Sequence, residues 1–369
     1  MGVFGSKPYD KEAVEKNMKD EVFEEFVERL PDLSGKVVAI TGCTTGLGLW
    51  AAIAAAKKGA ARVLMLNRKS TRSEDAETKV KERAGVGVAV ETVELDLMSP
   101  ASVKACAERL TELLKGKGGL NVLANNAGIM AMKDVRTESG YEVQMQTNQL
   151  CHALLTSLLM PLLEEAAEKN GESRVVMHSS SARDIPSGNL KLEYFRPCEP
   201  GTLGGDNNSM VWEAATGAGG PWQRYHQTKL ANVCFALALS RKLKERGSKV
   251  KVAAADPGVA VTELQVTSPG FKSLPNWLAS SIMAQTAADG STPLLACCFL
   301  PDVESGDFFL PKEKRKGWPV RSINAGVAVK SGGEKNALLA GNLEVAWKGS
   351  EEFVSKFSGR GEEREGGFF

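Results

Sequence analysis

Tyr225 and Lys229 lie four residues apart in the segment YHQTK, a spacing that places both side chains on one face of a helix. A phenol has an ordinary pKa of about 10, and a nearby ammonium stabilises its anion and brings proton exchange within reach of neutral pH. The pair could therefore serve as a general acid when a carbonyl is reduced, or as a general base when an alcohol is oxidised. An isolated pair of this kind is often structural, but this one follows a strand-like segment that ends in His178 and three serines.

A second candidate site is the glycine-rich segment TGCTTGLG at residues 41–48, which lies between the apolar run KVVAIT and an alanine-rich helix expected from about Leu47. Such a strand-to-helix turn lets the backbone approach a pyrophosphate, and the N–H groups at the helix start bind it. A plain tight turn is the alternative. The residues expected to bind phosphate are Gly42, Thr44, Thr45, Gly46, Leu47 and Gly48.

The end of the next apolar run, ARVLML, indicates which dinucleotide would bind. A nicotinamide coenzyme without a 2′-phosphate is usually held there by a carboxylate, whereas the phosphorylated form needs a cation. The run is followed by Asn67, Arg68 and Lys69, and the first carboxylate is Glu74. Arg68, supported by Lys69, can donate charge-assisted hydrogen bonds to a phosphate. The sequence favours NADPH over NADH, and the alternative is a solvated basic turn.

The elements that position these residues alternate between short β-branched runs and longer helical segments from Lys36 onward. This order predicts an α/β, doubly wound Rossmann fold with a seven-stranded parallel sheet and helices on both faces. The expected divisions are an N-terminal helical extension (1–34), a catalytic domain (35–315) and a C-terminal extension (316–369). Long helices are expected over residues 141–170 and 223–246.

Three segments lie outside this alternation. Residues 10–30 carry a helical apolar stripe, which predicts an arm packed on the domain; a surface for a partner or a membrane is the alternative. Residues 343–357 could form an amphipathic helix before a disordered end. The insertion 183–221 is rich in Gly, Pro and Asn and could be a substrate lid, or a surface excursion remote from the substrate. The whole segment between Ser180 and Tyr225 includes the apolar residues Leu190, Leu192, Tyr194, Phe195, Leu203, Met210, Val211, Trp212 and Trp222.

Composition excludes several other classes of protein. The 46 basic and 45 acidic residues nearly cancel, which argues against a nucleic-acid partner. Seven scattered cysteines without a CxxC pair indicate buried thiols in a reducing compartment, and three histidines without a metal motif predict no metal site. The longest apolar stretch, from Leu150 to Leu163, is broken by His152 and Pro161, so no transmembrane helix is expected.

Four motifs in order resemble the short-chain dehydrogenase/reductase family: the TGxxxGxG turn, NNAG at residues 125–128, YHQTK at 225–229, and Pro257-Gly258. They span about residues 35 to 310. Within the family, YHQTKLANVCFALALSRKL and TNQLCHALLTSLLMPLL look most like the branch of retinol dehydrogenases and WW-domain oxidoreductases.

This resemblance implies roles for individual residues. Ser180 would hydrogen-bond the substrate oxygen, although Ser179 and Ser181 remain open, and Lys229 would hold the coenzyme's ribose. Asn148 would position a water in a proton relay. Asn125 would lie against the ribose, Asp96 against the adenine and Thr262 near the nicotinamide amide. Further coenzyme contacts would come from Leu97, Ala127, Gly128, Tyr225, Pro257 and Gly258.

The chain also departs from the branch at three positions. Cys151-His152 stands where the branch usually has glycine followed by histidine, and His152 is expected to face a neighbouring helix or subunit, without a catalytic role. His178 stands where valine is usual, and Asp256 precedes Pro257-Gly258. The sequence gives no account of the last two.

The function implied is an NADPH-dependent oxidoreductase acting on the carbonyl or alcohol of a small hydrophobic substrate, such as a retinoid, a steroid or a lipid-like aldehyde or ketone. Catalysis would be mostly orientation and electrostatics. Two alternatives stay open: a reductase of a tetrapyrrole double bond similar to protochlorophyllide reductase, and a non-enzymatic NADPH-binding regulator. An oligomer is compatible with the sequence.

The first residues, MGVFGSK, fit the pattern for N-myristoylation of Gly2. One acyl chain gives only weak, reversible membrane binding, and the lysines nearby are interleaved with acidic residues. The expected location is the cytoplasm, with peripheral membrane association through an acylated Gly2.

Overall fold

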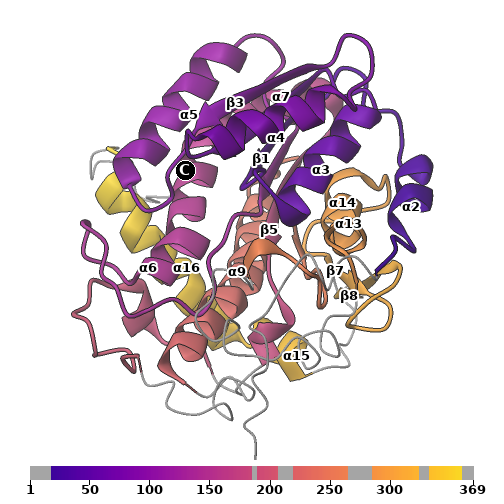
Figure 1. Cartoon of the computed structure of the whole chain (residues 1–369). Coiled ribbons are helices and arrows are strands. Elements are labelled where there is room, and N and C mark those ends of the chain that lie inside the picture. The colour runs from indigo at the N-terminus through magenta and orange to yellow at the C-terminus, as the bar shows by residue number, and fades with distance from the viewer. Residues whose placement is uncertain (1–17, 185–188, 207–218, 265–284, 324–331, 360–369) are drawn as a thin grey trace, which may run out of the picture.

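The computed structural model places the strand-like segments side by side in one sheet of eight strands, in the order β3-β2-β1-β4-β5-β6-β7-β8 (Figure 1). The structure describes residues 18–184, 189–206, 219–264, 285–323 and 332–359. The strands are β1 (Val37–Thr41), β2 (Arg62–Asn67), β3 (Ala89–Glu94), β4 (Val122–Asn125), β5 (Ser173–His178), β6 (Val250–Ala255), β7 (Phe308–Pro311) and β8 (Pro319–Ile323). The doubly wound α/β fold expected from the sequence is confirmed.

The strand count is wrong by one, because the sequence analysis missed β8. β1 to β7 are parallel, but β8 pairs antiparallel with β7. Only seven residues separate β7 from β8, too few for a helical crossover, so the chain can only turn back beside itself. The sheet therefore continues beyond residue 315, into the segment expected to be an extension.

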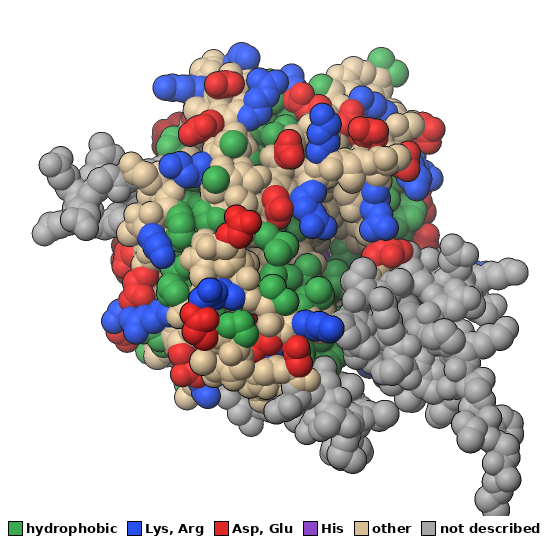
Figure 2. Space-filling view, turned by 60° about the vertical axis from the view of Figure 1, so that its left-hand side comes forward, with side chains coloured by type: hydrophobic (Ala, Val, Ile, Leu, Met, Phe, Trp, Pro, Cys, Tyr) green, Lys and Arg blue, Asp and Glu red, His purple; other side chains and the backbone are tan. Residues whose placement is uncertain are grey.

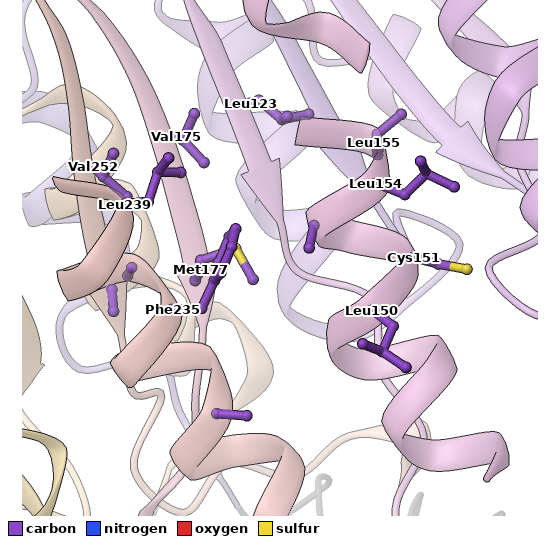
Figure 3. Packing of buried hydrophobic residues seen from close by; sticks show 14 of the residues in the cluster. Leu123, Leu150, Cys151, Leu154, Leu155, Val175, Met177, Phe235, Leu239 and Val252 are labelled. Carbon is purple, nitrogen blue, oxygen red and sulfur yellow. The ribbon is translucent and has the colours of Figure 1, made fainter. Parts of the chain in front are cut away.

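Helices cover both faces of the sheet because each strand is buried on both sides. Val175 and Met177 of β5 pack on one face, whereas Val176 between them packs on the other. On the first face lie α5 (Pro100–Leu114), α7 (Cys151–Asn170) and α9 (Gly220–Glu245), and Figure 3 shows Leu154, Leu155 and Phe235 packed there. On the second lie α3 (Gly46–Lys57), α4 (Thr71–Lys81), α13 (Ala287–Gly290) and α14 (Thr292–Phe299).

The helix expected over residues 141–170 contains an irregular turn. A short helix α6 (Val143–Met145) is followed by a π-helical segment η1 (Gln146–Leu150) and then by α7. The Cys151 N–H bonds back to the Gln146 carbonyl, five residues earlier. The run Val143–Asn170 is long and apolar enough to cross a membrane, but 78% of its most apolar window is buried inside the protein, as expected for a core helix.

The N-terminal arm is a helix α2 (Phe23–Arg29), held by the buried carboxylate of Asp289 in α13. That carboxylate accepts hydrogen bonds from the backbone N–H groups of residues 21, 22 and 23, at 2.8 to 3.0 Å. Phe23 packs edge-on against Trp50 of α3, with ring centres 5.0 Å apart. Within the described part of the predicted stripe, residues 18–30, the helix covers Phe23–Arg29, and residues 10–17 lie outside the described part.

The C-terminal extension forms α15 (Gly332–Leu338) and α16 (Ala340–Phe357). α16 starts three residues before the predicted helix and packs outside α9 and α7 (Figure 1). Trp347 stacks on Phe235 at 6.4 Å, and Phe353 meets Tyr141 edge-on at 4.9 Å. The end expected to be disordered, from residue 360, lies outside the described residues.

The expectation that the insertion 183–221 is a lid is wrong for its described part. This part contains two short 3-10 helices, η2 (Ser181–Asp184) and η3 (Leu192–Phe195). Leu190, Tyr194, Phe195 and Leu203 are buried in the core, and η3 packs against α16. Burying these side chains against α16 removes them from water more completely than a cleft lid would. Residues 185–188 and 207–218, with Met210, Val211 and Trp212, are not described.

Charged side chains of both signs are interspersed on the face shown in Figure 2, in keeping with a formal net charge of +1. Among the described residues there is no group of three or more His, Cys, Asp or Glu side chains that could hold a metal ion.

Candidate active site

A cleft of about 980 Å³ opens at the carboxyl ends of the parallel strands, where ligands bind in open α/β sheets. Its walls come from the turn after β1, the residues that follow β2 to β6, and the first turns of α9. The predicted site residues that line it are Gly42, Thr44, Thr45, Gly46, Leu47, Gly48, Arg68, Lys69, Asp96, Leu97, Ala127, Gly128, Ser180, Tyr225, Lys229, Pro257, Gly258 and Thr262.

The glycine-rich turn is a tightly packed cradle. Gly42 has a φ of +73°, and a Cβ there would lie 2.8 Å from the Ala127 Cα. A Cβ on Gly48 would lie 2.3 Å from the Gly42 carbonyl oxygen. Asn67 accepts a hydrogen bond from the Cys43 N–H at 2.7 Å and so fixes the turn to the end of β2. The local geometry therefore requires glycine and leaves backbone N–H groups near the cleft.

One end of the cleft, which we call the cation end, carries exposed basic side chains after β2. Arg68 and Lys69 lie there as predicted, and the sequence analysis missed Arg72, which also lines the cleft. Ser70 caps α4 by accepting from the Ser73 N–H, so Arg72 lies in the first turn of that helix. The third basic residue so soon after Arg68 and Lys69 was the signal that could have revealed it.

The other end, which we call the phenol end, brings together Ser180, Tyr225 and Lys229. The Tyr225 phenol hydrogen-bonds Ser180. The Lys229 Nζ donates to the His178 carbonyl at 3.1 Å and lies 5.6 Å from the centre of the Tyr225 ring. Ser179 points away from the phenol, because its hydroxyl donates to the Lys229 carbonyl at 2.8 Å. Of the three serines, Ser180 is therefore the one placed beside the phenol.

Burial controls the protonation of this end. Burial raises the pKa of Tyr225 above its ordinary value; the hydrogen bond with Ser180 lowers it and the charge of Asp256 raises it. Burial also lowers the pKa of Lys229 to about 8, against the opposing charge of Asp256. The expectation that the lysine brings the phenol pKa down toward neutrality is thus wrong for the protein alone. The phenol keeps its proton at neutral pH, which is the form that can donate it.

The buried ion pair of Arg183 and Asp256 lies next to the phenol end of the cleft. Arg183 and Asp256 bond to each other, and their side chains are only 3% and 2% exposed. Asp256 also accepts from the Gly258 N–H at 2.8 Å, and Arg183 donates to the Ser180 carbonyl at 2.9 Å. The Arg183 guanidinium lies over the Phe308 ring at 4.6 Å. This pair joins the end of β5 to the Pro257-Gly258 turn, and it explains the unexpected aspartate.

Two predicted residues lie behind the cleft wall. The Asn125 amide is fully buried and donates to Thr156 of α7 at 2.9 Å, so its expected place against a ribose is wrong. Side chains alternate along the chain, and the next residue, Asn126, lines the cleft instead. The Asn148 amide accepts from the Ile129 N–H at 2.8 Å and donates to Thr228 at 3.1 Å, so it ties η1 to α9.

The expectation that His152 faces a neighbouring helix or subunit is wrong, because its ring faces the end of β1. Its Nε2 lies 2.9 Å from the Thr41 hydroxyl and its Nδ1 lies 3.0 Å from the Asn148 carbonyl. A carbonyl can only accept, so Nδ1 carries the proton and Nε2 accepts from Thr41. Burial lowers the pKa of His152 to about 4, and the ring is neutral.

The wall beside the phenol is apolar. Met130 and Ala131 pack with Tyr225, and Ala182, Trp222 and Leu264 adjoin them. The Trp222 ring meets the Tyr225 ring edge-on, with centres 6.1 Å apart. Of the apolar residues named for the segment between Ser180 and Tyr225, Trp222 is the one that the structure describes in the cleft lining.

Comparison with known proteins agrees with this geometry. The profile of the short chain dehydrogenase family matches residues 36–191. Human retinol dehydrogenase 14 is 32% identical over 333 residues, which cover 80% of this chain and 88% of that protein. Mouse polyprenol dehydrogenase is 33% identical, over 64% of this chain and 63% of that protein. The chain spans 57%, 70% and 65% of the length of three further relatives.

Among solved structures, an uncharacterised protein from Mycobacterium paratuberculosis is similar, with 30% identity and a TM-score of 0.63, over 89% of this chain and 96% of that one. The fold, the ordered motifs and these relatives agree. The chain belongs to the short-chain dehydrogenase/reductase family of oxidoreductases, near its retinol dehydrogenase branch.

Proposed function

We propose that this protein is an NADPH-dependent oxidoreductase that interconverts the carbonyl and alcohol forms of a hydrophobic substrate such as a retinoid, a steroid or a lipid-like aldehyde. The observation that carries the proposal is the Tyr225 phenol, which is hydrogen-bonded to Ser180 and faces an apolar wall. A protonated phenol beside apolar surface suits the delivery of a proton to a carbonyl oxygen.

The cleft fits a dinucleotide. The cradle that a Cβ on Gly42 or Gly48 would fill can admit a pyrophosphate, and the backbone N–H groups of the turn would bind it. Arg68, Lys69 and Arg72 supply positive charge where a 2′-phosphate would lie, which supports NADPH rather than NADH. Bound there, the nicotinamide would supply or accept the hydride.

The chain's own residues would handle the proton. In the direction of reduction, the Tyr225 O–H donates its proton to the substrate oxygen, and the Ser180 hydroxyl donates a hydrogen bond to the same oxygen. Lys229, four residues along α9, carries the positive charge that stabilises the phenolate formed once the proton has left. Because its pKa is lowered to about 8, this lysine can itself exchange a proton near neutral pH.

The substrate class is supported by the apolar wall and by two relatives whose names are retinol and polyprenol dehydrogenases. Met130, Trp222 and Leu264 present apolar surface beside the phenol. Burial of an apolar substrate chain against such a wall contributes about 25 cal/mol of binding free energy for each Å² of apolar surface removed from water.

A panel of carbonyl substrates tests the proposal. We expect NADPH oxidation with long apolar aldehydes and ketones, at a higher kcat/KM than with short water-soluble ones of the same carbonyl type. NADH in place of NADPH should give a lower kcat/KM. A protein that binds NADPH but oxidises it with no aldehyde, ketone or quinone would contradict the proposed activity.

We also propose that the protein is cytoplasmic and binds membranes reversibly through an N-myristoyl group on Gly2. The sequence MGVFGSK alone supports this proposal. Residues 1–17 lie outside the described part. Intact-mass measurement on protein from its native cell should show the acyl mass, and Gly2→Ala should remove it. An unmodified N-terminus in that cell would refute the modification.

A further inference from the structure

His178 is a buried polar residue in the cleft lining that the mechanism above does not use. It ends β5, is 3% exposed, and lines the cleft directly before Ser179 and Ser180. Its backbone carbonyl accepts from Lys229 at 3.1 Å and from the Asn232 amide at 2.8 Å. The residue thus lies at the phenol end of the cleft, in contact with its lysine.

The orientation and tautomer of the imidazole follow from its contact with Asn126. The Asn126 amide nitrogen donates to the carbonyls of Thr41 and Gly42, at 2.9 and 3.3 Å, so the amide oxygen is the atom that faces His178. This oxygen lies 2.7 Å from Nδ1 and can only accept. Nδ1 therefore carries the proton, and Nε2 of the neutral ring is a hydrogen-bond acceptor.

Among the residues that the structure describes, Nε2 has no hydrogen-bond partner, although it is buried. Leaving a buried acceptor unpaired is costly, and a native protein usually keeps such a group only when something else satisfies it. Burial, with the charge of Lys229, lowers the pKa of His178 to about 3, so protonation does not relieve it at neutral pH. His226 also has an unpartnered Nε2, but it does not line the cleft.

The ring lies between the two parts of the site that a dinucleotide must join. Through Asn126 it is tied to the carbonyl of Gly42 in the phosphate turn, and through its own backbone it is tied to Lys229. A coenzyme that extends from the turn to the phenol end passes over this position. Its nicotinamide riboside carries hydroxyl and amide groups that can donate a hydrogen bond.

We propose that His178 binds the coenzyme, with Nε2 accepting a hydrogen bond from the nicotinamide riboside. The inference rests on the proposed function for the presence of a nicotinamide coenzyme, but it does not depend on the substrate or on the 2′-phosphate. His178 thus adds a fixed acceptor to a site whose other polar groups, Tyr225, Ser180 and Lys229, can all donate.

Coenzyme titration without substrate tests the proposal. His178→Val removes the acceptor, and we expect it to raise the Kd by about threefold to tenfold, equally for NADPH and NADH. His226→Gln is the matched control, since it alters a buried histidine outside the cleft, and its Kd should equal that of the wild type. An unchanged Kd in folded His178→Val, or an equal loss in the control, would overturn the proposal.

Coenzyme analogues identify the donor. The analogues are coenzymes that lack one nicotinamide-ribose hydroxyl, and the 3-acetylpyridine coenzyme, which lacks the amide N–H. Wild type and His178→Val should have the same Kd for the analogue that lacks the donor, and different Kd values for the others. A difference that persists with every analogue would overturn the proposal. If wild type binds neither NADPH nor NADH, the proposed function fails instead.

Nitrogen NMR of the histidine rings gives a readout independent of the variant's folding. In the wild type, the unprotonated Nε2 signal of His178, assigned by its absence from His178→Gln, should move upfield when NADP+ is added. A signal that stays in place on saturation would overturn the proposal.

Discussion

The two ends of the cleft place charge in opposite surroundings. At the cation end, Arg68, Lys69 and Arg72 are exposed, and water solvates each of them before any ligand arrives. At the phenol end, Lys229 and the pair Arg183–Asp256 are almost fully buried, and each charge has a protein partner. Exposed charge can be changed without harm to folding, whereas buried charge cannot.

This difference predicts separable effects. A substitution at the cation end should change ligand affinity alone. A substitution at the phenol end should change chemistry or stability, whether or not it also changes affinity, because the same contacts that set protonation also hold β5, β6 and α9 together.

The largest expected effect concerns the phenol. Tyr225→Phe removes the proton donor and should lower turnover by a factor on the order of 10² to 10⁴, with coenzyme binding nearly unchanged. Steady-state kinetics on any accepted substrate measures it. Tyr194→Phe is the control, since Tyr194 is buried under α16 away from the cleft, and it should keep the wild-type rate. Wild-type turnover in Tyr225→Phe would remove Tyr225 from the proton transfer.

The buried ion pair comes next. Arg183→Met leaves the Asp256 carboxylate buried without its partner and should lower the free energy of unfolding by about 3 to 5 kcal/mol. Denaturant unfolding measures the loss. In the double variant Arg183→Met/Asp256→Asn the loss should be smaller than the sum of the two single losses. Additive losses would show that the two side chains stabilise the fold independently.

The cation end should respond through affinity alone. Arg68→Ala should weaken NADPH binding roughly tenfold to a hundredfold, the scale of a hydrogen bond to a charged group, and leave NADH binding and the unfolding free energy unchanged. Arg109→Ala, an exposed arginine outside the cleft, serves as the control. An equal loss for both coenzymes would show that Arg68 does not contact a 2′-phosphate.

Between pH 7.5 and pH 5.5, the smallest effect is the loss of stability caused by each buried histidine, about 1.4 kcal/mol. His152 and His178 have pKa values lowered to about 4 and about 3, so the unfolded chain, near 6.5, binds protons that the folded chain does not. Stability is therefore fully present above pH 6.5 and falls as the pH decreases toward 4, by up to about 1.4 kcal/mol per pH unit for each histidine.

Denaturant unfolding at pH 7.5 and at pH 5.5 checks this dependence. His152→Gln should lose less stability between the two values than wild type, whereas Arg68→Ala should lose as much as wild type. An equal loss in His152→Gln and wild type would mean that His152 does not titrate as described.

The two ends also differ in how far they could be predicted. Arg68 and Lys69 follow β2 directly, and Tyr225 and Lys229 share one helix, so local spacing is enough to find them. The pairs that complete the phenol end join residues far apart in the chain: Arg183 and Asp256 are separated by 73 positions, and Asn126 and His178 by 52. They meet only because β5 lies between β4 and β6, and side-chain alternation decided that Asn126, not Asn125, reaches the cleft.

The fold shows the same division. Strand and helix alternation predicted the parallel sheet, because both periodicities are visible over a few residues. The antiparallel β8 is a five-residue strand after a short turn, and no helical segment precedes it to mark it as the next strand in the alternation. The insertion carries apolar residues that suit either a lid or a core. Only the position of α16 decides that Phe195 is buried: a Cβ on Gly349 of α16 would lie within 2.5 Å of the Phe195 side chain.

The π-helical segment η1 makes the site sensitive to the number of residues as well as to their identity. A π turn accommodates one residue more than the helix around it. Deleting a single residue between 146 and 150 would let the helix close with regular bonds and keep its two flanks nearly in register, but residues inside the turn would shift by one helical position, about 100° about the axis. Thr147 in the cleft lining and Asn148 on Thr228 could not both keep their places. Insertions and deletions in this stretch should therefore be as damaging as the loss of a reactive side chain, although each would leave Tyr225, Lys229 and Ser180 in the sequence.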